Sequence, residues 1–361
     1  MPRKDAHMPT IYVNYGTDLA RMAGELLEGA HVADRLDAGM RAAIKPNLVV
    51  ARPAAGGATT HPEIIEGIIC YLRDHGIREI FIIEGSWVGD DTKRAFQTCG
   101  YAALADRYGV RLVDTKSSPS VRLEAHGMQL AVCRVALETD FLINVPVLKG
   151  HCQTQLTCCL KNLKGIIPDA EKRKYHTMGL HKPIAALNTL VHPALHVVDG
   201  ICGDPTFEEG GNPVECGRMM LGFDPVALDS YGAALLGLDP GGIGYLKLAR
   251  DHGVGVFADE STEIIELNAA HRPKTDIPRG SLVRRLAGSI REDSACSACY
   301  AALVCALNQT AWQGAPIHIG QGWRGKAVDG VGVGNCAAGC TRHAPGCPPT
   351  ALGIVDFLGS I

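Results

Sequence analysis

Short apolar runs alternate with helical segments over residues 11–268 of this 361-residue chain, and this alternation limits the folds that it can adopt. The clearest helix is predicted over residues 61–75, with Pro62 in its first turn and Gly76 just past its end. Strands separated by helices predict an α/β fold, with a mostly parallel sheet and helices on both of its faces. The runs that read as strands are residues 11–15, 41–46, 78–85, 110–115, 140–146, 194–200, 218–224 and 263–268.

The carboxyl ends of these strands are the expected place of a functional site, because ligands bind there in parallel α/β sheets. Lys45 and Asn47 lie at the end of the predicted strand 41–46, and we assign both to the binding of a cofactor. Glu84 ends the next strand, but a lone carboxylate is weak evidence of acid–base chemistry. Asp224 precedes a proline and is expected to cap a helix.

A basic stretch follows the predicted strand 140–146. Residues 149–176 carry six lysines and arginines against two acidic residues, and they also hold two histidines. We predict catalytic roles for Lys149, His151 and His176, and cofactor binding for Lys161 and Asn162, which lie beside a glycine turn that suits a phosphate or carboxylate. Residues 172–174 are expected to form a solvent-exposed helix face. The Walker pattern is absent from the sequence, which argues against a nucleotide triphosphatase.

Cysteine content is the second unusual feature. The chain has 14 cysteines, and six of them fall within the final 66 residues: Cys296, Cys299, Cys305, Cys336, Cys340 and Cys347. In a cytosolic protein such a group indicates metal ligands or redox chemistry rather than disulfides. Four thiolates would suit either one zinc ion or a [4Fe–4S] cluster. The glycines around the second group and the proline after Cys347 favour the iron–sulfur cluster.

We predict that Cys296, Cys299, Cys336 and Cys347 are the metal ligands, with Cys340 as a rival to one of the last two. Cys305 lies in an apolar helical context and reads as a structural thiol. The tail has few charges and is expected to lack the apolar bulk for a core of its own, so a metal would supply folding free energy. The predicted organisation is an α/β domain over residues 9–270, a connector over 271–292 and a Cys-rich segment over 293–361.

The composition excludes several classes of partner. A formal net charge of -3 and 5% aromatic residues argue against nucleic acid. We see no apolar run near the length of a membrane span, so no membrane partner is expected. The first residues contain no signal-peptide core, which predicts a cytoplasmic protein.

Taken together, these motifs resemble the domain of unknown function 362 family. The resemblance covers about residues 40–255, and members often carry a C-terminal cluster segment, frequently of the ferredoxin type. This chain departs from that type because its cysteines form two separate groups. Where the family typically has two lysines in a Pro-Lys-Leu-Lys motif, this chain retains only Lys149. The matching motifs are Lys45-Pro46-Asn47, DFLINVPVLKGH (140–151), LKNLKGIIP (160–168), HVVDG (196–200) and GFDPVALDSYGAALLG (222–237).

The layout is also distantly similar to the nickel-pincer lactate racemase family, whose loops offer lysine and histidine to a nickel-bearing cofactor. This analogy is at the level of fold. It implies that Lys149, His151 and His176 have comparable roles toward such a cofactor.

These features predict an iron–sulfur oxidoreductase in which electrons pass from a [4Fe–4S] cluster to an anionic small molecule, or to a second cofactor, at the edge of the sheet. One alternative is a non-redox enzyme with nickel or zinc at a His/Lys site and a structural cluster. Another is a non-catalytic electron carrier. The expected partners are the anionic substrate and an electron-donor protein, and a homodimer is compatible with the sequence.

Overall fold

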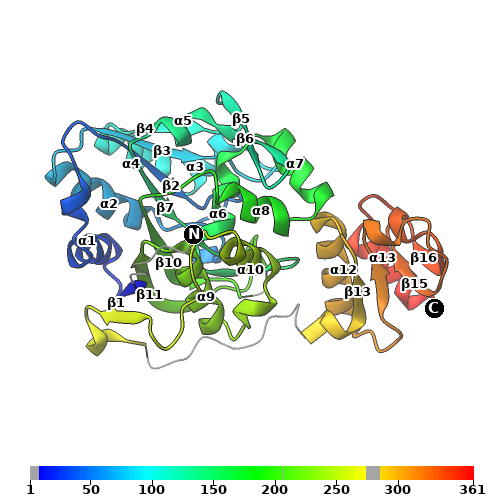
Figure 1. Cartoon of the computed structure of the whole chain (residues 1–361). Coiled ribbons are helices and arrows are strands. Elements are labelled where there is room, and N and C mark those ends of the chain that lie inside the picture. Colours follow the sequence, from blue (N-terminus) through cyan, green and yellow to red (C-terminus); the bar gives the residue numbers. More distant parts are fainter. Residues whose placement is uncertain (1–7, 206, 274–284) are drawn as a thin grey trace.

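The computed structural model describes residues 8–205, 207–273 and 285–361, which form a large α/β domain and a smaller C-terminal unit (Figure 1). The large sheet has eight strands in the order β12-β1-β11-β10-β7-β2-β3-β4. They coincide with the eight runs expected from the sequence. Their bounds are β1 Thr10–Tyr15, β2 Arg41–Pro46, β3 Glu79–Glu84, β4 Arg111–Asp114, β7 Phe141–Val145, β10 Leu195–Gly203, β11 Val214–Gly222 and β12 Glu263–Glu266.

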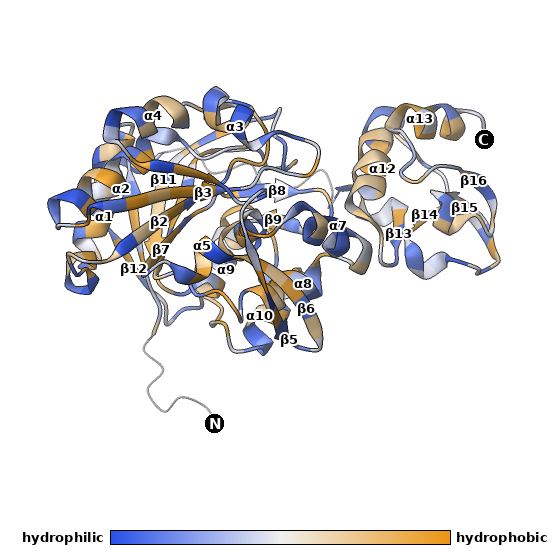
Figure 2. Cartoon of the chain, turned by 90° about the horizontal axis from the view of Figure 1, so that it is seen from above, coloured by the Kyte–Doolittle hydropathy of each residue, from blue (hydrophilic) through white to orange (hydrophobic). Residues whose placement is uncertain are grey.

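The sheet is mostly parallel, as predicted. β11 pairs antiparallel with both β1 and β10, and the other pairings within this sheet are parallel. Helices cover both faces (Figure 2). In β2, Ala42 and Ile44 pack into one core cluster with α1 and α2, whereas Ala43 faces a second cluster that includes residues of α8, α9 and α10. This division follows from the alternation of side chains along a strand.

The helices of the large domain begin and end close to local signals in the sequence. Pro62 is the first residue of α2, and Gly76, just past its end, adopts a positive φ of 87°. The side chain of Asp224 accepts hydrogen bonds from the backbone N–H groups of Val226 and Ala227, so it caps α9 as expected. The bounds are α1 Leu19–Gly29, α2 Pro62–Asp74, α3 Thr92–Thr98, α4 Tyr101–Tyr108, α5 Arg134–Glu138, α6 Cys159–Asn162, α7 Asp169–Met178, α8 His181–Leu187, α9 Pro225–Leu235 and α10 Gly244–Asp251.

Two short hairpins, which the sequence did not predict, accompany the sheet. One pairs β5 (Ser120–Ala125) with β6 (Met128–Cys133), and the other pairs β8 (Lys149–His151) with β9 (Gln155–Thr157). The second hairpin places Lys149 and His151 next to the edge of the sheet where β2 and β3 end. Among the described residues, no helix combines the length and apolar character that crossing a bilayer requires.

The C-terminal unit has a core of its own, and the expectation that the tail lacks one is wrong. It contains a parallel sheet in the order β13-β14-β15-β16, formed by β13 (Ile290–Glu292), β14 (Ile317–Ile319), β15 (Val328–Val333) and β16 (Cys340–Ala344). Side chains from these strands pack in one cluster with residues of α12 (Ser297–Thr310) and α13 (Ala351–Gly359). Isoleucine and leucine supply most of its large side chains, with alanine and valine between them, and they are scattered along the tail rather than gathered in long apolar runs.

The predicted connector, residues 271–292, falls in part outside the described residues, because 274–284 are not among them. The structure places β13 at its end. The large domain also contributes to the core of the tail, since Cys152 belongs to that cluster and Phe207 packs against it. α12 lies beside α7 in both views (Figures 1 and 2).

Candidate functional site

A pocket rich in lysine lies at the carboxyl ends of β2 and β3, and we refer to it as the lysine pocket. Its free volume is about 80 Å³, which is room for several water molecules or a small ligand. The side chains around it come from strand ends, from α6 and from α7. They are Lys45, Asn47, Val49, Glu84, Gly85, Trp87, Val88, Thr157, Lys161, Asn162, Lys164, Gly165, Lys172 and His176.

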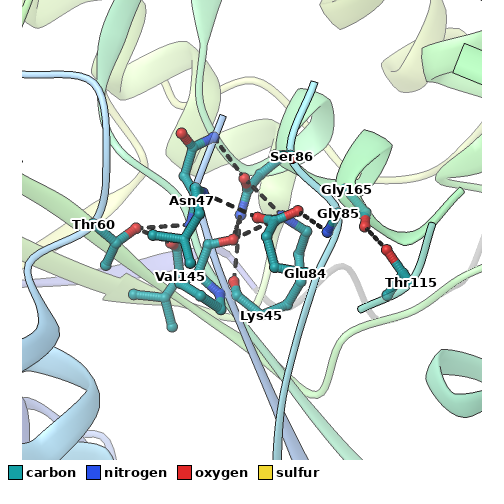
Figure 3. Close-up of polar contacts among 12 residues, drawn as sticks. Lys45, Asn47, Thr60, Glu84, Gly85, Ser86, Thr115, Val145 and Gly165 are labelled. Carbon is teal, nitrogen blue, oxygen red and sulfur yellow. Dashed lines mark hydrogen bonds and ion pairs between the residues drawn. The ribbon is translucent and has the colours of Figure 1, made fainter. Parts of the chain in front are cut away.

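A buried ion pair forms the floor of the lysine pocket (Figure 3). Lys45 Nζ lies 2.7 Å from Glu84 Oε2 and 3.0 Å from Asn162 Oδ1, and both charged side chains are almost fully buried. Glu84 also accepts hydrogen bonds from the backbone N–H groups of Leu48 and Gly85. Gly165 closes over the pair so tightly that a Cβ there would lie 1.8 Å from Glu84 Oε1. This position therefore requires glycine.

Lys172 is buried, so the prediction that residues 172–174 form an exposed face is wrong for this residue. Its ammonium group donates to the carbonyl oxygens of Gly85 (2.8 Å) and Ser86 (2.7 Å). These acceptors are far away in the sequence, and a local pattern cannot reveal them. Burial lowers the pKa of Lys172 to about 8.

Lys161 and Lys164 give the lysine pocket its unfilled donors. Lys161 Nζ donates to Thr157 Oγ1 at 3.1 Å, and within the described part of the chain Lys164 Nζ has no hydrogen-bond partner. Burial lowers the pKa of Lys161 to about 8, and it also lowers the pKa of Lys164. Four lysines thus face a single lining carboxylate, that of Glu84. This excess of positive charge suits an anionic ligand.

His176, on α7, completes the ring of polar groups. Burial lowers its pKa to about 3, and the positive charges of Lys164 and Lys161 act in the same direction. The imidazole is therefore neutral near pH 7, with one ring nitrogen that accepts and one that donates. In this state it can donate or accept a hydrogen bond with a bound molecule without adding charge to the pocket.

Lys149 lies behind the lysine pocket rather than in its wall. Its ammonium group donates to Asn47 Oδ1 (2.9 Å), to the carbonyl oxygen of Glu208 (2.8 Å) and to that of Ala58. All three of its hydrogens are used in these bonds. Burial lowers its pKa to about 7. The contacts make Lys149 an anchor that holds Asn47 against the pocket.

His151 lies in a separate group with Cys152 and Glu208, and their ligand atoms are within 4.8 Å of one another. The backbone N–H groups of Gln153 and Thr154 both point at His151 Nδ1, at 3.0 and 3.1 Å. Nδ1 is therefore an acceptor, and the ring proton resides on Nε2, 3.4 Å from Glu208 Oε1. Neither nitrogen is left for a metal, so the three residues fit a hydrogen-bonded network.

The alternative of a metal bound by both His151 and His176 also lacks a common ligand set. In the described ranges, no metal-sized group of ligand atoms contains both histidines. The other such group consists of Cys158, Cys159 and Asp229, and all three are buried. Asp229 accepts from the backbone N–H groups of Cys159 and Leu160 and so caps α6, which is a structural role.

The tail brings Cys296, Cys299, Cys336 and Cys347 to one edge of its sheet. Cys296 precedes α12 and Cys299 lies in the first turn of this helix, whereas Cys336 follows β15 and Cys347 follows β16. Burial raises the pKa of Cys299 to about 11, and the thiolates of Cys296, Cys347 and Cys336 add to the rise. The four sulfur atoms are therefore within electrostatic reach of one another.

Cys340 and Cys305 lie outside this group. Cys340 begins β16 and is buried, and burial alone raises its pKa. Cys305 lies on α12, and the charges of Glu208 and Glu209 in the large domain add to the rise in its pKa that burial causes. The structure thus groups the four cysteines that the sequence nominates as ligands and leaves the rival thiol of Cys340 apart from them.

The four cysteines are not gathered as closely in this structure as the ligands of a single zinc ion would be. Four thiolates around one zinc, each about 2.3 Å from the metal, lie about 3.8 Å from one another. In the described part of the tail, no three metal-ligating atoms lie within 4.8 Å of one another. A cluster with one iron for each thiolate holds its four ligands further apart. Two further donors point at the sulfur atoms, because Gln321 lies 3.6 Å from Cys296 Sγ and Arg324 lies 3.3 Å from Cys336 Sγ.

The sequence did not identify several of these residues. Lys164, Lys172, Trp87 and Glu208 line or adjoin the lysine pocket through long-range packing. Glu84 was visible as a carboxylate at a strand end, but its partner Lys45 lies 39 positions away.

The comparisons with known proteins concern mainly the large domain. A model of the family described as Domain of unknown function (DUF362) matches residues 42–234. A thylakoid-associated protein of Synechocystis sp. is 25% identical over 235 residues, which are 62% of this chain and 71% of that protein.

Two solved structures are also similar. The lactate racemase apoprotein from Thermoanaerobacterium thermosaccharolyticum has a TM-score of 0.37 and 15% identity, over 52% of this chain and 50% of that one. A structural-genomics protein from Thermotoga maritima has a TM-score of 0.40 and 13% identity, over 66% of this chain and 60% of that one. The chain thus spans half to three fifths of these two proteins. The expected distant similarity to a lactate racemase is found.

Proposed function

This chain belongs to the Domain of unknown function 362 family, and from that premise we propose that it is an iron–sulfur oxidoreductase acting on a small anionic molecule in the lysine pocket. The family match covers more than half of the chain and includes the lysines of the pocket. The observation that carries the proposal is the joint presence of two sites: a pocket with unfilled lysine donors and a group of four cysteines at the edge of the tail sheet.

The proposed ligands of a [4Fe–4S] cluster are Cys296, Cys299, Cys336 and Cys347. When bound, such a cluster supplies electrons one at a time. Cys299 lies in the first turn of α12, and because burial raises its pKa to about 11, the charge of bound iron would be needed to hold it as a thiolate. Gln321 and Arg324 direct N–H groups at two of the sulfur atoms, and donors of this kind support the negative charge of a cluster.

In the lysine pocket, Lys161 and Lys164 are proposed to bind the anion, because their donors are the least used. Lys45, Glu84 and Asn162 hold the floor rigid, and Lys149 keeps Asn47 in place. His176 is proposed to orient the bound molecule by a hydrogen bond from its neutral ring, because a pKa lowered to about 3 leaves it too weak a base to take up a proton near pH 7.

A non-catalytic electron carrier is the second candidate, and it would share the cluster but not need the lysine pocket. The depth of the pocket and its charge favour the enzyme. An electron-donor protein is expected as a partner in both cases.

Anaerobic purification of the full chain tests the proposal. We expect about four irons and four sulfides per chain and a broad absorption band near 400 nm that bleaches on reduction. One zinc and no sulfide would instead make the tail a structural zinc unit, and the redox function would have to be withdrawn.

Replacement of Lys164 by alanine is expected to weaken anion binding by about tenfold to a hundredfold, the effect of losing one charged hydrogen bond worth about 1.5–3 kcal/mol. The probe is inorganic phosphate, titrated by calorimetry. The control is Lys182→Ala, an exposed lysine at the start of α8. Because Lys161 loses its proton as the pH rises through about 8, binding to the wild type is expected to weaken above that pH. Equal affinities of the two variants would contradict an anion site here.

A further inference from the structure

Two hydrogen bonds between the tail and the large domain lie close to Cys296. Gln153, which follows His151 and Cys152, donates its side-chain amide to the carbonyl oxygen of Ala295 at 2.6 Å. Ala295 directly precedes Cys296. On the other side, Gln321 donates to the carbonyl oxygen of Thr177 at 2.5 Å, and Thr177 directly follows His176 of the lysine pocket.

The same amide of Gln321 also points at Cys296 Sγ, 3.6 Å away. A side-chain NH₂ group has two hydrogens, so it can make both contacts at once. One side chain therefore touches a cysteine of the tail and the end of α7, in the turn next to the residue that lines the lysine pocket.

The turn that carries Gln321 is built to hold it in this position. The backbone N–H groups of Gln321 and Gly322 donate to the carbonyl oxygens of Ser294 and Asp293, just before Cys296. Gly320, with a φ of 120°, lies so close that a Cβ would be 2.0 Å from the carbonyl oxygen of Asp293. Such contacts fix the backbone of Gln321 relative to the cysteine before any ligand binds.

We propose that Gln321 is a positioning residue that orients Cys296 toward the lysine pocket, so that Cys296 is the cluster ligand through which the tail and the anion site communicate. The inference rests on the proposed function, because it requires a cluster. The proposed ligands have different surroundings. Cys347 is exposed to solvent, whereas Cys296 is half-buried at the contact with α7.

The test is the reduction potential of the cluster in the full chain, measured by redox titration with an EPR readout. Gln321→Leu removes both N–H donors at similar size, and Gln321→Glu replaces them by a negative charge. An N–H group directed at a ligand sulfur stabilises the more negative, reduced state. We therefore expect the potential to fall in the Leu variant and to fall further in the Glu variant.

Gln313→Leu is the matched control. Gln313 is an exposed glutamine of the same tail, and its amide contacts only the carbonyl oxygen of Ala311 among the described residues. The potential of this variant is expected to equal that of the wild type. Iron and sulfide are counted in every sample, so that loss of the cluster is not mistaken for a shift.

The outcomes separate the two proposals. A wild type without iron and sulfide would overturn the proposed function and this inference with it. Full clusters in all variants, with unchanged potentials in both Gln321 variants, would overturn this inference alone. If the Leu variant does not retain its cluster, the Glu variant and a Gln321→Asn variant, whose amide is one methylene shorter, decide the question by the same measurement.

Discussion

Replacement of Cys299 by serine is expected to remove the iron–sulfur cluster almost completely, with loss of the band near 400 nm and of the iron and sulfide. Cys299 lies in the first turn of α12, and the charges of the three other proposed ligands act on its thiol. A serine oxygen is a much harder ligand than a thiolate and matches iron–sulfur clusters poorly. The measurement is iron and sulfide content after anaerobic purification.

Two control variants make this result specific. Cys305→Ala changes a thiol on the same helix, and Cys340→Ala changes the rival thiol in β16. Both are expected to retain the full iron and sulfide content, because neither thiol adjoins the four-cysteine group. Loss of the cluster in Cys340→Ala, with retention in Cys347→Ala, would show that the ligand assignment is wrong.

Replacement of Glu84 by glutamine is expected to lower the free energy of unfolding by about 3–5 kcal/mol, the cost of leaving one partner of a buried ion pair without the other. Lys45 is almost fully buried and has no other carboxylate within ion-pair distance among the described residues. Urea denaturation of the variant and the wild type measures the difference. The control is Glu79→Gln. Glu79 lies on the same strand as Glu84 and forms an exposed ion pair with Arg111, so this change should cost less than about 1 kcal/mol.

The loss in free energy of unfolding caused by Glu84→Gln is expected to depend on pH. Burial lowers the pKa of Lys45, and Glu84 opposes this effect, so the variant lowers that pKa further. Between the folded-state pKa and the unfolded value near 10.4, the unfolded chain binds more protons, and the stability of the folded state rises with pH. The variant should therefore recover part of its stability as the pH increases toward 10. If the loss in stability instead grows with pH, the unpaired Lys45 is not its cause.

The large sheet could be predicted from the sequence because most of its strands are short, buried, apolar runs, whereas the edge strands β4 and β12 are more exposed. The reversal of β11 could not be predicted, since direction is set by tertiary pairing with β1 and β10. In the tail, the core was overlooked because its isoleucines and leucines are scattered over residues 290–358 rather than gathered in long apolar runs.

The site was predictable where the rule of strand ends applies. Lys45, Asn47, Lys161, Asn162 and His176 all line the lysine pocket. Lys149 and His151 do not, because the β8–β9 hairpin turns them toward carbonyl oxygens and backbone N–H groups behind it. A hairpin of three-residue strands leaves too short a pattern to recognise.

The reversed strand β11 has a consequence for how the two halves of the molecule respond to ligands. Because it runs against β10, the connection between them returns at the edge where the site lies, and it brings Glu208 to Lys149 and Cys152. Its neighbour Phe207 packs against the core of the tail. The connection between β10 and β11 thus contacts the β8–β9 hairpin through Glu208 and the core of the tail through Phe207. A ligand that displaced this connection would change the energy of both contacts together, and the coupling between occupancy of the pocket and seating of the tail would then be reciprocal, each altering the other by the same factor.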